Sequence, residues 1–265
     1  MSCRRLYAAL VLALLPSLGS AATTERLTDE QVKKLIQDID IGYDTWKKGL
    51  EKENLDDAVI TSAERTIRVK SFLEDFEKAI DGVKDRFKPD YAASPEVLAL
   101  LRRGSDVELH NRRQGRTPSS EWPALATKLG TLAAAYGVGW PVQSMNVQAS
   151  RLNDGELAAR VEQVAKGAKA LQGETEKAAR ANKSIDKAAR ESLKRSIQGF
   201  EQKAKDVQAR LKEDRPASVE VGQLLSQARA IKETQGKLSL PATASWQGID
   251  AGLEALARSF DMARS

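Results

Sequence analysis

The sequence contains two similar stretches, 124 positions apart. Trp122, Leu125, Leu129, Leu132 and Tyr136 recur, without a gap, as Trp246, Ile249, Leu253, Leu256 and Phe260. Nearer the N-terminus the match continues at a distance of 125 positions, where Thr28-Asp29-Glu30-Gln31 corresponds to Asn153-Asp154-Gly155-Glu156. A stretch that recurs at a fixed distance is the signature of a repeated structural unit. We therefore expect one unit written twice.

Apolar residues within each copy are three or four positions apart, a spacing typical of helices that pack in a bundle. In residues 27–53 the apolar series is Val32, Ile36, Ile39, Tyr43, Trp46 and Leu50. A second series covers residues 69–87, and we expect its helix to begin near residue 56 and to span about 45 Å. Alternating strand patterns are nearly absent. The predicted fold is all-α, with an internal duplication that gives two tandem up-and-down helical bundles of about four helices each.

The predicted boundaries follow from the repeat and from one irregular segment. Residues 23–138 are assigned to the first bundle repeat, residues 139–150 to a linker, and residues 151–265 to the second bundle repeat. In the first repeat a short third helix is expected from Ser94, followed by a polar loop, and a fourth helix from about Ser120. Whether the two bundles share one core is left open by the sequence.

Residues 1–22 resemble a cleaved secretory signal peptide. Arg4 and Arg5 precede an apolar run from Leu6 to Leu15, and small residues follow at positions 19–22. The Arg4-Arg5 pair leaves a twin-arginine route open. The apolar run is too short for a comfortable membrane span, and the mature chain contains no other candidate. We expect an exported protein that resides in the periplasm.

The composition argues against most kinds of catalysis. The single cysteine, Cys3, lies in the signal segment, and the rest of the chain contains one histidine, His110. Zinc, haem and di-metal carboxylate sites need more such ligands, and no nucleophile motif accompanies His110. We therefore expect that the protein is not an enzyme and that it has no cofactor and no metal site. Because Lys and Arg are well mixed with Asp and Glu and the net charge is only +5, nucleic acid is not an expected partner.

Two features without a close counterpart in the second repeat are candidates for binding. One is the predicted loop that contains five arginines, Arg102, Arg103, Arg112, Arg113 and Arg116. These residues could hold an anionic envelope surface or an acidic protein, or they could pair with acids of neighbouring helices. The other is Trp140 in the linker, which could wedge the two repeats together or present an exposed contact to a partner. Trp122 and Trp246 are interpreted as core residues rather than as a stacking site for a ligand.

The leading functional hypothesis is a non-enzymatic helical module that binds another exported or envelope protein, as an adaptor, chaperone or inhibitor. It depends on the missing catalytic residues and on the extended helical faces that two bundles provide. The alternative is a carrier of a small apolar or anionic ligand between the helices of one bundle, which requires a cavity.

Overall fold

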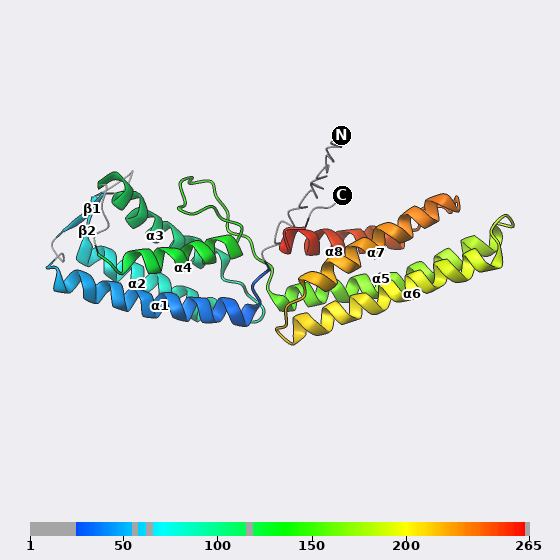
Figure 1. Cartoon of the computed structure of the whole chain (residues 1–265), viewed down its shortest axis with the longest axis horizontal. Coiled ribbons are helices and arrows are strands. Elements are labelled where there is room, and N and C mark those ends of the chain that lie inside the picture. The colour runs from blue at the N-terminus through cyan, green and yellow to red at the C-terminus, as the bar shows by residue number, and fades with distance from the viewer. Residues whose placement is uncertain (1–24, 55–57, 62–65, 115–118, 263–265) are drawn as a thin grey trace, which may run out of the picture.

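The computed structural model describes residues 25–54, 58–61, 66–114 and 119–262. These residues form eight helices and one small two-stranded sheet, so the all-α prediction is confirmed (Figure 1). The helices are α1 (Asp29–Lys52), α2 (Val69–Arg86), α3 (Ser94–Gln114), α4 (Trp122–Ala135), α5 (Asp154–Ala181), α6 (Lys187–Lys212), α7 (Ser218–Lys237) and α8 (Ser245–Ser259). The predicted signal peptide, residues 1–22, lies outside the described residues.

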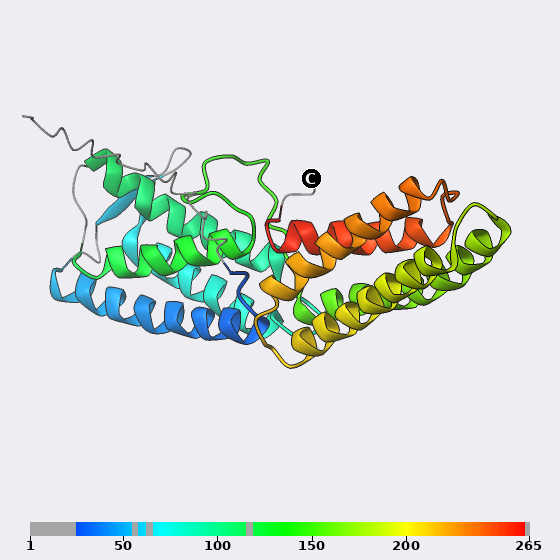
Figure 2. The same cartoon turned by 45° about the vertical axis from the view of Figure 1, so that its right-hand side comes forward.

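Buried apolar side chains form two clusters along the length of the molecule. Helices α1 to α4 surround the first cluster, and α5 to α8 surround the second. Figures 1 and 2 show the two groups of helices end to end, with α5 beginning where α1 also begins. The sequence left open whether the two groups of helices share one core. The structure shows two separate clusters of buried side chains, one in each group.

Aromatic rings fill the first cluster. Tyr43 and Phe76 stack with ring centroids 5.3 Å apart, and Trp46 lies 4.9 Å from Trp122. The Trp122 indole also donates a hydrogen bond to Glu108 at 2.9 Å. A buried indole N–H needs such an acceptor, because leaving it unpaired costs free energy.

The second cluster contains a short chain of buried polar groups. The Trp246 indole donates to Gln235 at 2.7 Å, and the Gln235 amide donates to the Thr175 hydroxyl at 2.9 Å. Gln235 is 7% exposed and Thr175 is 3% exposed. These bonds fix the end of α7 and the start of α8 beside Thr175 in α5.

One predicted helical stretch is wrong. Residues 56–68 were expected to extend α2, but β1 (Val59–Thr61) and β2 (Thr66–Arg68) pair antiparallel, and α2 begins only at Val69. The physical reason is the run of β-branched residues, since five of the six strand residues are valine, isoleucine or threonine. Ile60 packs into the first cluster.

The predicted loop after a short third helix is also wrong. Helix α3 continues to Gln114. The stretch contains Gly104 and is highly charged, which favours a loop in the sequence, but Gly104, Ser105, Val107 and Asn111 form a buried stripe at helical spacing. Burial of that stripe against α4 and the linker holds this part of the chain in a helix.

Candidate functional site

The arginines proposed from the sequence do not form one site. Arg102 and Arg103 lie in the middle of α3, whereas Arg112 and Arg113 lie in its last turn. Arg116 lies outside the described residues. Arg102 donates to the Met145 carbonyl at 2.9 Å, Arg103 is 3.9 Å from Asp75, and Arg112 pairs with Glu108 at 3.0 Å. Three of these arginines therefore contact residues of the first group of helices or of the linker.

Trp140, which was a candidate for a wedge between the two repeats or for an exposed contact, packs on the first group of helices. Its ring packs on α3 and α4, against the first cluster, where it covers two glycines. A Cβ added at Gly104 would lie 2.8 Å from the Trp140 ring, and one at Gly130 would lie 3.3 Å from it. Its place on α3 and α4 does not fit a wedge between the two repeats. The ring is only partly buried, so a contact of Trp140 with a partner stays a prediction. The linker folds back because Val142 donates its N–H to the Ser105 hydroxyl at 2.7 Å.

A different basic surface lies at the free end of the α5–α6 hairpin. The Gln235–Thr175 bond and a bond from the Ser245 N–H to Glu174 place the α7–α8 end beside residues 174 and 175. Helix α5 continues for six residues beyond Thr175, which is about 9 Å at the rise of an α-helix. Figures 1 and 2 show this hairpin as the far end of the molecule, past the ends of α7 and α8.

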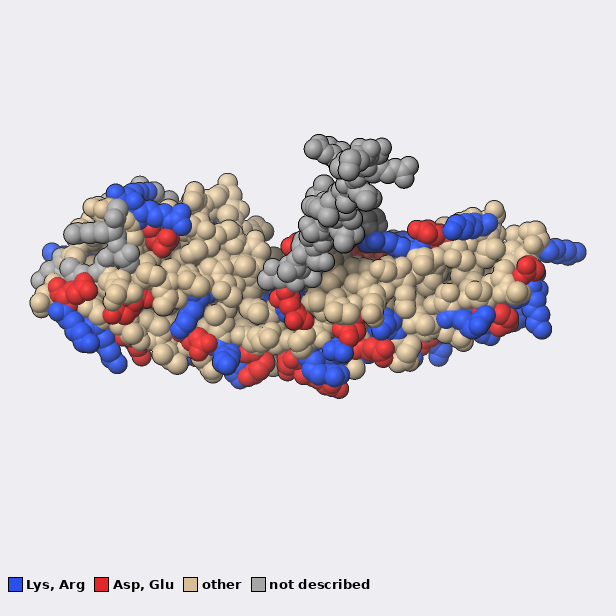
Figure 3. All heavy atoms as spheres, viewed as in Figure 1, with Lys and Arg blue, Asp and Glu red and all other residues tan. Residues whose placement is uncertain are grey.

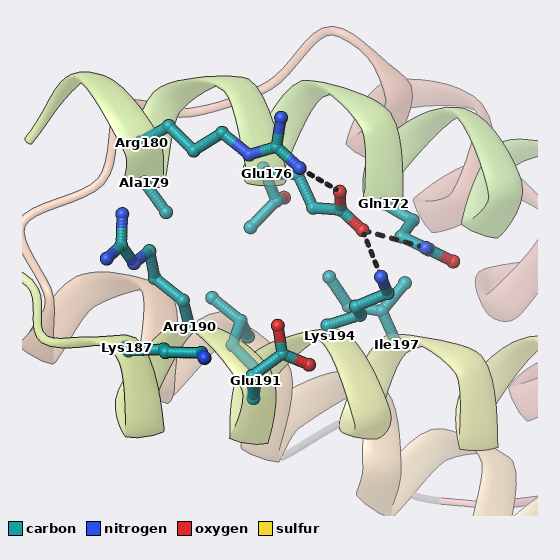
Figure 4. Close-up of a pocket in the computed structure, with 11 residues that line it drawn as sticks. Gln172, Glu176, Ala179, Arg180, Lys187, Arg190, Glu191, Lys194 and Ile197 are labelled. Atoms are coloured by element: carbon teal, nitrogen blue, oxygen red, sulfur yellow. Dashed lines mark hydrogen bonds and ion pairs between the residues drawn. The ribbon is translucent and has the colours of Figure 1, made fainter.

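A groove of about 240 Å³ opens between α5 and α6 in this exposed end. Its floor is apolar, with Ala179 at 2% exposure and Leu193 and Ile197 at 1% each. Its sides carry cations from both helices, and Figure 4 shows Arg180 above the opening and Arg190 and Lys187 below it. We call this the hairpin groove. It presents positive charge around an apolar floor that is almost fully buried.

Electrostatics within the hairpin groove leave much of its positive charge available. Glu176 accepts hydrogen bonds from Gln172 at 2.9 Å and from Arg180 at 3.4 Å, and it forms an ion pair with Lys194 at 3.4 Å. The Gln172 bond first, and then the Lys194 bond and the nearby cations, lower the pKa of Glu176 and keep it ionised. Among the described residues, Lys187 and Arg190 form no ion pair. The cations without an ion pair, Lys187 and Arg190, therefore lie on the α6 side of the groove.

The charge of the hairpin end is strongly one-sided. Residues 177–195 contain seven Lys and Arg residues against two Asp and Glu residues, a local charge of +7 − 2 = +5. Figure 3 shows several blue side chains at this end of the molecule, with red side chains among them. This stretch does not stand out in the sequence, because its lysines and arginines are spread at helical spacing instead of forming a run. A charge count in a sliding window would have found it.

A second cavity, of about 740 Å³, lies where the two groups of helices meet. Arg26, Arg151, Arg160 and Arg258 line it. Arg26 and Arg151 pair with Asp154 and Asp29, and Arg258 pairs with Glu254. Since most of these arginines already have carboxylate partners, this cavity has no comparable excess of charge.

Two further features are absent from the part of the chain that the structure describes. No group of three or more His, Cys, Asp and Glu residues there could hold a metal ion. None of the helices described combines the length and apolar character needed to cross a membrane.

Comparison of the chain with protein-family models, with curated proteins and with solved structures found no match.

Proposed function

We propose that this protein is a non-enzymatic exported module that binds an acidic segment of another envelope protein in the hairpin groove. The observation that carries the proposal is the uncovered end of the α5–α6 hairpin, with its apolar floor and its local charge of +5. The carboxylates of an acidic helix would complement this positive charge.

The size of the groove favours a protein segment over a small molecule. Pockets for small ligands usually enclose about 300–1,000 Å³, and the hairpin groove is smaller, at about 240 Å³. A few side chains of a partner helix would fill it, and the flanking cations would meet that helix's carboxylates. Such pairs add specificity and speed association more than they add affinity.

A small anionic ligand is the second candidate. Arg180, Lys187 and Arg190 come from two helices and border one opening, so a carboxylate or phosphate group could contact several of them. An apolar carrier has less support, because the described bundle interiors are filled by stacked and tilted aromatic rings.

We also propose that residues 23–138 and 151–265 are two copies of one unit, joined by the linker at 139–150. Both α1 and α5 begin with a capping box, formed by Thr28 and Gln31 in one case and by Asn153 and Glu156 in the other. Both α4 and α8 begin near a buried tryptophan. The hairpin groove belongs to the second copy, because the β1–β2 ribbon replaces the start of the corresponding helix in the first copy.

Export through residues 1–22 to the periplasm completes the proposal. It is supported by the charged, apolar and small-residue segments of that stretch. Detection of mature protein that begins near residue 23 in a periplasmic fraction tests it directly. Retention of the full N-terminus in the cytoplasm contradicts it.

Site-specific photo-crosslinking in the native envelope tests the binding function. A photoreactive residue at position 191 faces the hairpin groove, and one at position 113 in the last turn of α3 serves as the control position. We expect a discrete protein adduct from position 191 only. Equal adducts at both positions, or none at position 191, contradict the proposal. An adduct with a small anion or a lipid supports the second candidate instead.

A matched pair of charge reversals tests the electrostatic part. Arg180→Glu/Arg190→Glu is expected to abolish the adduct, whereas Arg112→Glu/Arg113→Glu changes the net charge equally and is expected to preserve it. If the two double variants weaken the adduct to the same degree, long-range charge and not the groove controls binding.

A further inference from the structure

The two groups of helices are joined by a buried network of four charged side chains. Arg26 and Asp29 come from the start of the first group, and Arg151 and Asp154 from the start of the second. Arg26 pairs with Asp154, and Arg151 pairs with Asp29 at 2.7 Å. The two arginine side chains are only 6% and 2% exposed. Burial first, and the nearby Arg151 charge second, lower the pKa of Arg26, while Asp154 opposes that shift.

Each aspartate also binds the first backbone N–H of the opposite helix. The Asp29 N–H donates to Asp154 Oδ2 at 2.8 Å, and the Asp154 N–H donates to Asp29 Oδ2 at 2.7 Å. The first N–H groups of a helix have no partner within the helix and carry partial positive charge. Helices α1 and α5 therefore cap each other.

The two arginines also make reciprocal contacts with backbone carbonyls and aromatic rings of the opposite group. Arg26 donates to the Leu152 carbonyl at 2.7 Å, and Arg151 donates to the Leu27 carbonyl at 2.8 Å. The Arg26 guanidinium lies 5.5 Å from the ring of Phe260, and that of Arg151 lies 6.0 Å from the ring of Tyr136. Every one of these contacts from the first group to the second has a counterpart in the opposite direction.

Reciprocal contacts of this kind define an isologous interface, the type found in two-fold symmetric dimers. The paired residues are 125 positions apart in the helix starts and 124 apart for the two aromatic residues. We propose that the junction is a self-complementary interface, so that the surface of either half fits a second copy of the same half. This inference goes beyond the proposed binding function and does not depend on the hairpin groove.

The first half carries all the groups that such pairing needs. Arg26, Leu27, Asp29 and Tyr136 provide the cation, carbonyl, carboxylate and ring that Arg151, Leu152, Asp154 and Phe260 provide in the second half. In the wild-type chain the linker holds the two halves together at a high effective concentration, so pairing within one chain prevails. We therefore expect the wild-type protein to be a monomer, because the surface of each half that could pair with a second chain is already covered by the other half of the same chain.

Removing the charged residues of one half at a time tests this inference in the full mature chain. In Arg151→Ala/Asp154→Ala the internal junction is lost, while the first-half residues remain intact and free to pair with those of a second chain. The mirror variant, Arg26→Ala/Asp29→Ala, frees the second-half residues. Light scattering coupled to size exclusion is expected to show twice the mass of a single chain for both variants at high protein concentration, and the single-chain mass on dilution.

The control removes all four charged residues together. This variant also loses the internal junction, but neither half retains the groups for pairing, so a monomer is expected. If both double variants stay monomeric, with the helical content of the wild type, the interface is not self-complementary. A dimer of the four-residue variant also overturns the inference, because pairing would then arise from other surfaces. Should one double variant fail to fold, its mirror variant still decides the question.

Discussion

Substitution of Asp154 by alanine is expected to destabilise the junction far more than loss of a surface ion pair would. Asp154 accepts from Arg26 and from the Asp29 N–H, so its removal leaves a buried cation and a helix N–H without their acceptor. Breaking one partner of a buried ion pair typically costs about 3–5 kcal/mol. Arg112→Ala is the matched control, because it removes the exposed Arg112–Glu108 pair, in which the arginine side chain is 57% exposed, and leaves Glu108 to accept from Trp122. Its cost is expected to be about 0–1 kcal/mol.

The reciprocal geometry gives this prediction a second arm. Asp29→Ala leaves Arg151 and the Asp154 N–H in the same situation. We therefore expect the two aspartate variants to lose similar free energies, within about 1 kcal/mol, although one residue belongs to each half. A double-mutant cycle for Arg26 and Asp154 and another for Arg151 and Asp29 should return similar coupling energies.

Calorimetry and fluorescence together provide the assay. The wild type is expected to unfold in one transition, and Asp154→Ala in two, because the two apolar clusters then unfold separately. Trp246 is the one tryptophan in the second half, so a background with that residue replaced by phenylalanine reports on the first half alone. A loss below about 1 kcal/mol, as for the exposed pair, refutes the reasoning. So does a large difference between the Asp29 and Asp154 variants.

Three further changes test other parts of the structure. Gly104→Ala should lower the free energy of unfolding by about 1–3 kcal/mol, because the new methyl group would overlap the Trp140 ring; helix propensity alone predicts stabilisation of about 1 kcal/mol, and urea denaturation distinguishes the two. Gln235→Leu leaves the Trp246 indole N–H without its acceptor and should cost about 1–3 kcal/mol in thermal unfolding; an unchanged midpoint contradicts this. Burial and nearby carboxylates raise the pKa of Asp214, and an acid with a raised pKa in the folded state makes the protein less stable as pH rises through that range. Asp214→Asn should therefore raise the free energy of unfolding at neutral pH by less than about 1 kcal/mol at this exposed site, seen as a higher melting temperature, and leave both unchanged below pH of about 3.9; equal gains at both pH values contradict the electrostatic explanation.

The hairpin groove was not predicted because it depends on where other helices end. The sequence shows that residues 177–195 are basic, but it does not show that α7 and α8 stop beside Thr175 and leave the hairpin uncovered. The arginines of α3 illustrate the opposite case. They stand out in the sequence, yet three of them have partners in α2, α3 and the linker.

The sequence by itself determined the all-α class and the positions of several helix starts. Both depend on short-range interactions: apolar spacing over three or four residues, and capping boxes in which Thr28 and Asn153 bind the backbone three positions later. Tertiary structure alone decided the β1–β2 ribbon, the full length of α3 and the position of Trp140. A strand needs a partner strand, and a glycine in a helix can serve close packing as well as a turn.

The junction between the two groups of helices depends both on local sequence and on tertiary structure. Local sequence places Arg26 and Asp29 at one helix start and Arg151 and Asp154 at another, at a constant distance of 125 positions. Only the folded chain brings the two starts together, because contacts between groups so far apart depend on the packing of all the helices between them. Burial of these four charges is favourable only when each finds its opposite partner, and that condition is met by the tertiary structure.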